Sequence, residues 1–456
     1  MTNTDGTPLA FADPHGYTPA DIQALYHLDP SLGEGLTIAV VDAYGYQDLE
    51  SDLATYRAQF GIPACTVASG CLTILNNAGQ SSPLAMDTDQ GWISETALDV
   101  QMVSAACPKC KILVVQTEGA GNGLEIGQLV ARDQAVDAIS NSWGGNEYPE
   151  ILGKEGDYNN PGIGTFASTG DNGYAPGPQY PASSAFVIAV GGVSWDGTTS
   201  TAWSGAGSGC SGVIPKQSWS PIDAPCQMRA YSDISALADP ATGVATFNLK
   251  QGKWQIVGGT SAATPIVAAL FAAAGHADAK PGFVYAHRDA FIDVVGGSNG
   301  TCGNLCDAIA GWDGPTGVGY PDQTKLLGIG NVAGAGPAVA ISYPKDGADV
   351  TAKFTIAATP DPATTWLEIQ IDGTRVARLA ADPWTVSAPA SLANGKHTIT
   401  AIAYDLDHNS QTATSTVTLG EVAAKDDGIC SASGGRPSGL VVIAIAGLVA
   451  TRRRRR

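Results

Sequence analysis

Short apolar runs rich in β-branched residues recur through the first 330 residues, and helix-like segments separate them. Runs of this kind, which predict buried strands, cover residues 36–41, 111–115, 138–142, 164–167 and 186–190. Helical periodicity covers residues 93–106 and 122–134, and Thr18-Pro19 supplies an N-cap and a first residue for an earlier helix. Strands without a polar face that alternate with helices predict an α/β domain, with a mostly parallel sheet covered on both faces.

The pattern changes near residue 331, where alternating runs replace the α/β texture. Residues 330–337, Gly-Asn-Val-Ala-Gly-Ala-Gly-Pro, are typical of a linker. Alternating runs follow at residues 339–343, 354–358, 367–371 and 398–404. Asp372-Gly373 and Asn394-Gly395 supply turns between them. This part of the chain therefore predicts an all-β sandwich of about the size of an immunoglobulin domain.

The segments YPKDGADVTAKFTI and GKHTITAIAYDLDHNS resemble bacterial Ig-like modules over residues 338–420. Such modules usually space or bind and rarely catalyse, so the chemistry is expected in the α/β part. The predicted organisation is a flexible lead (1–16), an α/β domain (17–330), a linker (331–337), an Ig-like domain (338–420) and a tail (421–456).

The tail carries an apolar run, residues 439–450, that ends against the arginines of 452–456. The run is shorter than the ~20 residues that span a bilayer comfortably, so a buried core helix is the alternative. Positive charge held on the cytoplasmic side explains the arginines better and favours membrane attachment. With Cys430-Ser-Ala-Ser-Gly-Gly, the tail resembles the C-terminal sorting signals of myxobacterial surface proteins. That resemblance implies cleavage or attachment at Cys430, and a plain tail anchor is the alternative.

The nine cysteines point to an oxidising compartment. Eight of them form four close pairs, Cys65/Cys71, Cys107/Cys110, Cys210/Cys226 and Cys302/Cys306. Cys430 has no close partner. Short-range pairs in loops predict disulfides and an exported protein. Zinc is the alternative at Cys107-Pro-Lys-Cys110, but no second CxxC or HxxxH accompanies it. Residues 1–16 carry no signal-peptide pattern, so a longer reading frame is expected.

The net charge of the chain limits the classes of molecule that it can bind. The chain has 24 Lys and Arg against 43 Asp and Glu, a formal net charge of −19. This charge repels phosphate and argues against nucleic acid as a partner. It suits a protein that works in acid, where partial protonation of carboxylates lowers self-repulsion, and plain solubility is the alternative.

The segment Gly258-Gly-Thr-Ser261-Ala-Ala-Thr-Pro265 is the sharpest local signal for chemistry. The glycines let backbone approach closely, and Ser261 opens an apolar helix whose N-terminus offers N–H groups to a developing oxyanion. The alternative is that Thr260 or Ser261 merely caps the helix. A nucleophilic serine also needs a base.

Histidine is the usual base, but none of the six histidines begins a His-Gly-Thr-His-type helix, and only His276 and His287 remain as candidates. Carboxylates are better placed. Glu95 and Asp99 lie four residues apart in a helical pattern, so they share one face and can touch. A proton shared between them raises one pKa and yields a carboxyl base. An exposed acidic face is the alternative.

A third carboxylate lies in Ser168-Thr-Gly-Asp171-Asn-Gly173, directly after the predicted strand at 164–167. Turn chemistry alone explains Asp171 and its glycines. A carboxylic acid that is kept neutral can instead donate a hydrogen bond to an oxyanion.

These motifs occur together with YTPADIQALY, SNSWGG, YPASSAFVIAVGG, DISALADPATG and GWDGPTGVGYPD. Over residues 17–325 the chain resembles the sedolisins, serine-carboxyl peptidases on a subtilisin-like fold. The resemblance implies four catalytic residues, namely the nucleophile Ser261, the general base Glu95, its partner Asp99 and the oxyanion stabiliser Asp171.

The resemblance also implies residues around this centre. Asp42 falls where the family often has a glutamate that extends the carboxyl network, and Trp143 falls near that network. The backbone of Ser142, Trp143 and Gly144 would line the substrate cleft. One calcium ion is implied near the end of the domain, with oxygen ligands from Asp293, Val294, Ile309, Gly311 and Asp313. Oxygen-only ligation suits a hard cation, and the Cys302/Cys306 pair lies inside the same loop.

The sequence therefore predicts an extracellular or surface-attached bacterial serine endopeptidase that acts in acid on proteins or peptides, as a monomer. A histidine-type subtilase is the alternative enzyme, and the missing histidine motif counts against it. An alternative of another class is a surface-displayed binding protein with an inactive peptidase domain, but all four catalytic positions are filled. About 16 residues precede the match. The long propeptide common in the family is therefore expected to be absent, separately encoded or lost with a wrong start.

Overall fold

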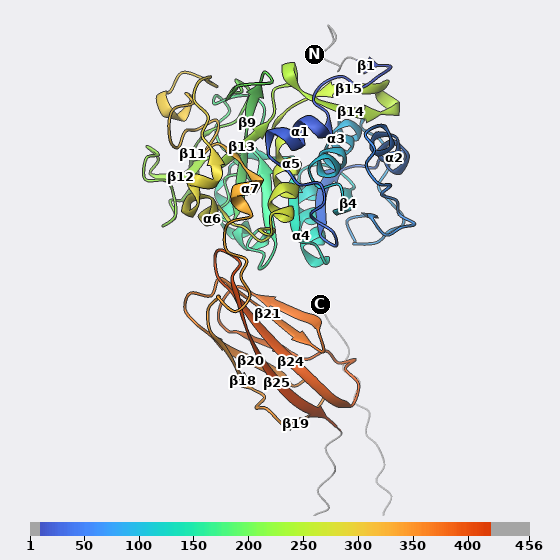
Figure 1. The fold of residues 1–456 in the computed structure, drawn as a ribbon, viewed down its shortest axis with the longest axis vertical. Coiled ribbons are helices and arrows are strands. Elements are labelled where there is room, and N and C mark those ends of the chain that lie inside the picture. Colours follow the sequence, from blue (N-terminus) through green and yellow to red (C-terminus); the bar gives the residue numbers. More distant parts are fainter. Residues whose placement is uncertain (1–9, 421–456) are drawn as a thin grey trace, which may run out of the picture.

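The structure is a computed structural model that describes residues 10–420 as an α/β domain followed by a β-sandwich (Figure 1). The predicted tail, with Cys430 and the apolar run 439–450, lies outside the described residues, as do residues 1–9 of the predicted lead. Within residues 10–420, none of the helices is long and apolar enough to cross a membrane.

An eight-stranded sheet forms the centre of the first domain, in the order β10-β9-β7-β5-β2-β4-β3, with β13 beside β9. Its strands are β2 (Thr37–Ala43), β3 (Leu72–Leu75), β4 (Lys111–Thr117), β5 (Ala138–Asn141), β7 (Gly164–Ser168), β9 (Val187–Trp195), β10 (Ser200–Ala202) and β13 (Ile234–Leu237). The pairings are parallel except that of β10 with β9. The five strands predicted from apolar runs all belong to this sheet, which confirms the predicted fold class.

Helices cover both faces of the sheet. They are α1 (Pro19–Leu25), α2 (Leu49–Gln59), α3 (Gln90–Ala106), α4 (Asn122–Asp133), α5 (Thr260–Ala273), α6 (Pro281–Ala286) and α7 (Gln323–Leu326). In β2, Val40 packs with α3 and α5, whereas Val41 packs with α4. Because side chains alternate across a strand, Asp42 points to the face of α3 and α5. Every residue of α5 is buried, which makes it the central helix of the domain.

Short strands complete the domain. They are β1 (Ala10–Phe11), β6 (Gly145–Asn146), β8 (Gln179–Tyr180), β11 (Gly209–Pro215), β12 (Met228–Tyr231), β14 (Val244–Asn248), β15 (Lys253–Val257), β16 (Phe291–Ile292) and β17 (Tyr320–Pro321). Strand β1 pairs with β15, with Phe11 opposite Trp254. The prediction of a flexible lead is therefore wrong for these residues, because backbone pairing with a distant strand holds them in place.

The second domain is a sandwich of two sheets, which confirms the Ig-like expectation. Its strands are β18 (Val339–Tyr343), β19 (Ala348–Val350), β20 (Thr355–Pro360), β21 (Trp366–Ile371), β22 (Thr374–Leu379), β23 (Thr385–Ser387), β24 (Gly395–Tyr404) and β25 (Ser410–Leu419). The sheets run β18-β20-β23 and β19-β25-β24-β21-β22. Alternate residues of β24 fill the core, since Ile399, Ala401 and Ala403 are fully buried.

All four predicted cysteine pairs form disulfides: Cys65–Cys71, Cys107–Cys110, Cys210–Cys226 and Cys302–Cys306. The zinc alternative at Cys107 and Cys110 is therefore excluded, because both sulfur atoms are used in one S–S bond. Cys110 is fully buried beside α3, so this bridge fastens the end of the helix that carries Glu95 and Asp99.

Candidate active site

Ser261 lies in the first turn of α5, and the residues around it explain its position. Gly259, just before the helix, has φ of +112°, and a Cβ there would lie 2.6 Å from Asp171 Oδ2, so the close approach requires glycine. Pro265 has no N–H, so the carbonyl of Ser261 lacks the donor that a helix normally provides four residues on. The hydroxyl of Ser142 lies 3.3 Å from that carbonyl oxygen, on the side that the missing donor leaves open.

Three carboxyl groups gather beside Ser261. The hydroxyl of Ser261 donates a hydrogen bond to the carboxyl of Glu95. Asp99, one turn further along α3, is fully buried, and the Ser142 hydroxyl lies 2.8 Å from its Oδ1. Asp42 extends from the carboxyl end of β2 into the same group and is also fully buried. The structure thus brings together Ser261, the predicted base and both predicted members of its network.

Burial raises the pKa of each of these carboxyl groups, and repulsion from neighbouring carboxylates adds to the effect for Glu95 and Asp99. Burial raises the pKa of Glu95 to about 8, with the charges of Asp42 and Asp171 adding. Burial also raises the pKa of Asp42 to about 7. For Asp99, burial and then the charges of Asp42 and Glu95 place the pKa well above its ordinary value. The cluster therefore holds protons near neutral pH, so one carboxylate can act as a base while a neighbour carries a shared proton.

These shifts predict that the free energy of unfolding falls as pH rises from about 4 to about 8. In the unfolded chain both Asp42 and Glu95 titrate near pH 4, whereas in the folded chain they titrate at about 7 and about 8. The folded state binds more protons, so stability is greatest below the unfolded pKa and is lost as pH rises through the folded pKa. Urea unfolding of a Ser261→Ala chain at pH 4.5 and pH 7.5 measures the difference. Asp42→Asn should flatten the dependence, and a parent equally stable at both pH values would contradict it.

Asp171 stands on the other side of Ser261, in the loop after β7. Its Oδ1 accepts hydrogen bonds from the Thr260 backbone N–H at 2.7 Å and from the Thr260 hydroxyl at 2.9 Å. Burial of the carboxyl group raises the pKa of Asp171, while the rest of the residue is open to solvent. A carboxyl group held through one oxygen and kept neutral can donate through the other. From the sequence, Thr260 is predicted only as a possible helix cap. Its position next to Ser261 is the one sequence feature that indicates its role in holding Asp171.

The site lies at the carboxyl ends of adjacent parallel strands. Asp42 belongs to β2, Ser142 follows β5 and Asp171 follows β7. Ligands of α/β sheets bind at this edge. A cavity of about 210 Å³ adjoins the predicted cleft, and its walls include Leu124, Glu125, Trp143, Gly144, Tyr148 and Tyr180.

The two histidine candidates are engaged elsewhere. His276 is buried, with Nε2 3.0 Å from the carbonyl oxygen of Leu326. His287 contacts Asp407 of the second domain, with 2.6 Å between Nε2 and Oδ1. These partners hold both rings away from the carboxyl cluster, so the geometry favours a carboxyl base over a histidine.

The predicted calcium ligands lie in one loop region after β16. Asp293 Oδ2 accepts a hydrogen bond from Gly311 N at 2.9 Å, and Asp313 Oδ2 lies 3.3 Å from Ile309 N. Asp313 is fully buried, and burial, with the charge of Asp293 adding, raises its pKa to about 7. Among residues 10–420, no group of three or more His, Cys, Asp or Glu side chains could hold a metal. Two carboxylates and backbone carbonyls still fit a hard cation, because no ion pair within the described residues 10–420 involves the buried carboxyl group of Asp313.

Comparisons with known proteins find relatives of both domains. Residues 74–287 match the Subtilase family, and residues 337–401 match the Bacterial Ig domain family. Kumamolisin of Bacillus sp. (strain MN-32) is 29% identical over 365 residues, which cover 69% of this chain and 64% of that protein. Sedolisin of Pseudomonas sp. (strain 101) is 35% identical over 186 residues, which cover 34% and 31% of the two chains. The chain thus spans less than two thirds of the length of these curated relatives.

Among solved structures, Pseudomonas sedolisin (serine-carboxyl proteinase) in complex with two molecules of pseudo-iodotyrostatin aligns with a TM-score of 0.60 at 24% identity. The alignment covers 70% of this chain and 98% of that one, which shows that the folds agree. Together the matches show that the first domain is similar to serine peptidases of the sedolisin family, and that the second is similar to bacterial Ig domains.

Proposed function

We propose that this chain is an acid-acting serine endopeptidase in which Ser261 attacks the peptide bond, Glu95 and Asp99 form its base and Asp171 stabilises the oxyanion. One observation carries the proposal: the hydroxyl of Ser261 donates a hydrogen bond to Glu95, one of three carboxyl groups that gather beside it. A carboxylate that already accepts this hydrogen bond is placed to take the proton when the serine attacks.

In the proposed reaction, Glu95 takes the hydroxyl proton as Ser261 Oγ bonds to the substrate carbonyl carbon. The negative charge that develops on the carbonyl oxygen is met by the protonated carboxyl of Asp171, which Thr260 holds in place. Glu95 then passes the proton to the leaving amine, and the acyl-enzyme ester forms. Water hydrolyses the ester by the reverse sequence. Asp99 keeps the shared proton near Glu95, and Ser142 ties Asp99 to the first turn of α5.

The test of this proposal is digestion of denatured protein and of a peptide library at acid pH by the full chain, and its loss in Ser261→Ala. A chain that binds peptides but cleaves none at any pH would favour the inactive binding protein instead. The P1 preference follows from the same library.

We propose one structural calcium ion in the loop that joins Asp293 to Asp313. The ion would be held by both carboxylates and by the backbone oxygens of Val294, Ile309 and Gly311. Its charge would compensate the buried carboxylate of Asp313, whose pKa is raised to about 7 in its absence. The Cys302–Cys306 disulfide within the same loop supports this role, because it limits the conformations that the loop can adopt.

If the ion is bound, excess chelator should lower the melting temperature of the full chain by several degrees. An ion at 100 times its dissociation constant stabilises the folded state by about 2.7 kcal/mol. Asp313→Asn should remove the response to chelator. Asp223→Asn is the matched control, because Asp223 lies beside the same loop and pairs with Arg288 instead. A melting curve of the parent that chelator leaves unchanged would contradict the site.

We propose that the protein acts outside the cell or at the bacterial surface, as a monomer on protein and peptide substrates and without nucleic acid. Four disulfides support an oxidising compartment, and the net charge of −19 disfavours polyanions. Membrane attachment would come from the tail of residues 439–456, through the apolar run and its arginines.

A further inference from the structure

The Ig-like domain packs against the amino-terminal edge of the parallel sheet, opposite to the proposed active site (Figure 1). Arg378 of β22 donates from Nη1 to the carbonyl oxygen of Gly162, which precedes β7, at 2.9 Å. Trp366 of β21 donates from Nε1 to Asp278 Oδ2 at 2.7 Å. The residues around Ser261 follow the other ends of the same strands, so the second domain leaves the cleft open.

Two histidine–aspartate pairs cross this interface in opposite directions. His287 of the α/β domain contacts Asp407 of the Ig-like domain, with 2.6 Å between Nε2 and Oδ1. His408 of the Ig-like domain contacts Asp278 of the α/β domain, with 2.9 Å between Nδ1 and Oδ1. Each domain thus supplies one histidine and one aspartate. The four side chains are only 9–35% exposed, so solvent and salt screen the pairs less than they would at an open surface.

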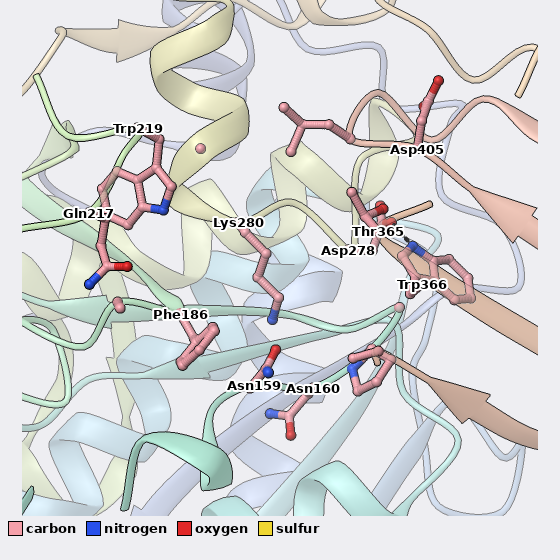
Figure 2. A pocket seen from close by; sticks show the side chains of 16 residues that line it. Asn159, Asn160, Phe186, Gln217, Trp219, Asp278, Lys280, Thr365, Trp366 and Asp405 are labelled. Carbon is pink, nitrogen blue, oxygen red and sulfur yellow. Dashed lines mark hydrogen bonds between the residues drawn. The ribbon is translucent and has the colours of Figure 1, made fainter. Parts of the chain in front are cut away.

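Asp278 is shielded from solvent, with a side chain only 9% exposed, which strengthens its contacts. A cavity of about 230 Å³ lies between the domains, and Figure 2 shows Lys280 extending between Trp219 and Trp366. The Lys280 ammonium donates to the Ile163 carbonyl at 2.9 Å. Although burial alone raises it, the contacts with His408 and Trp366 hold the pKa of Asp278 below its ordinary value. Asp278 therefore stays ionised in moderate acid.

Other titratable groups also lie at the interface between the two domains. Burial lowers the pKa of His276, and burial lowers the pKa of Lys280 to about 8. Arg378 pairs with Glu368 at 3.2 Å. Burial raises the pKa of Tyr404 to about 12, so it is uncharged, and Asp405 accepts the backbone N–H of Asp407. Among these groups, His287 and His408 are the histidines in contact with a carboxylate across the interface, and histidine is the type whose charge ordinarily changes between pH 5 and pH 7.

We propose that the two reciprocal histidine–aspartate pairs clamp the Ig-like domain to the peptidase domain in acid, and that the clamp loosens as the pH approaches neutral. In acid each pair joins an imidazolium to a carboxylate, and this attraction between opposite charges is absent when the ring is neutral. Histidine side chains as a class lose their charge on the way to neutral pH, which removes the attraction between opposite charges from both contacts. The clamp is independent of the proposed catalysis, because none of its residues belongs to the carboxyl cluster.

The test replaces each histidine with the amide that keeps its contacting nitrogen but cannot be charged. His287→Gln preserves a donor at the position of Nε2, and His408→Asn preserves one at Nδ1. Hydrogen exchange of the double variant and the parent, both in the Ser261→Ala background, is compared at the same pH so that intrinsic rates cancel. At pH 5 we expect exchange in segments 276–287 and 404–409 to be about tenfold faster in the double variant. At pH 7 we expect the two proteins to exchange equally.

His397→Asn is the matched control. His397 contacts Asp372 at 2.6 Å from Nδ1, but both residues belong to the Ig-like domain. This variant should leave segment 276–287 unchanged at both pH values. Equal exchange of parent and double variant at pH 5 would overturn the clamp, and so would a difference that is as large at pH 7 as at pH 5.

Discussion

Replacing Ser261 with alanine is expected to lower kcat/KM for peptide cleavage at pH 4 by on the order of 10⁴-fold or more. The hydroxyl is the attacking group, and it is already hydrogen bonded to the proposed base. Glu95→Gln should cost nearly as much, because an amide cannot accept the proton. The double variant should be no worse than either single one, since the two groups act as a unit.

Single-turnover and steady-state cleavage of a fluorogenic peptide measure these losses, with melting curves to show that each variant is folded. Ser81→Ala is the control, because Ser81 lies exposed in a loop outside the site. A Glu95→Gln enzyme with a kcat near that of the parent would reject Glu95 as the base. Residual cleavage in Ser261→Ala at the parent's rate would reject the serine mechanism as a whole.

The parts of the fold that the sequence predicted best depend on local pattern. Strand β2 was predicted from the β-branched run that begins at Leu36, and its alternation places Val40 and Asp42 on one face. Ser261 was expected at the start of a helix, and α5 begins at Thr260. The disulfides followed from spacing, because cysteines only a few residues apart have few other partners within reach.

The contacts that the sequence did not predict join residues far apart along the chain. His287 was considered as a base, yet its partner is Asp407, 120 residues away and in another domain. Residues 10–11 lie in the predicted flexible lead but form a strand, because Phe11 pairs with Trp254, which is even further away along the chain. Within the site, the motif around Ser261 does not reveal what Pro265 does. The structure shows that the proline leaves the Ser261 carbonyl without its helical donor, and that the Ser142 hydroxyl lies 3.3 Å from that oxygen.

Activity is expected to be confined to acid, with kcat/KM falling at least 100-fold between pH 4 and pH 8. Asp171 must carry a proton in order to donate to the oxyanion, and burial raises its pKa only in part against the opposing hydrogen bonds from Thr260. As pH rises through that pKa, the donor becomes an anion that repels the charge it should stabilise. Asp171→Ala should cost on the order of 100-fold or more even at pH 4, in line with the loss of one oxyanion donor.

Asp171→Asn separates this explanation from a general loss of structure at neutral pH. The asparagine carbonyl can still accept from Thr260 N, now 2.7 Å from Asp171 Oδ1, while its amide points a permanent donor at the oxyanion. This variant should therefore keep activity at pH 4 within about tenfold of the parent and lose far less of it toward pH 7. Its alkaline limit would then be set by the Glu95–Asp99 pair, when that pair gives up its last shared proton. Full pH–rate profiles of parent and variant decide the matter, because an unchanged alkaline limb in Asp171→Asn would mean that another group controls it.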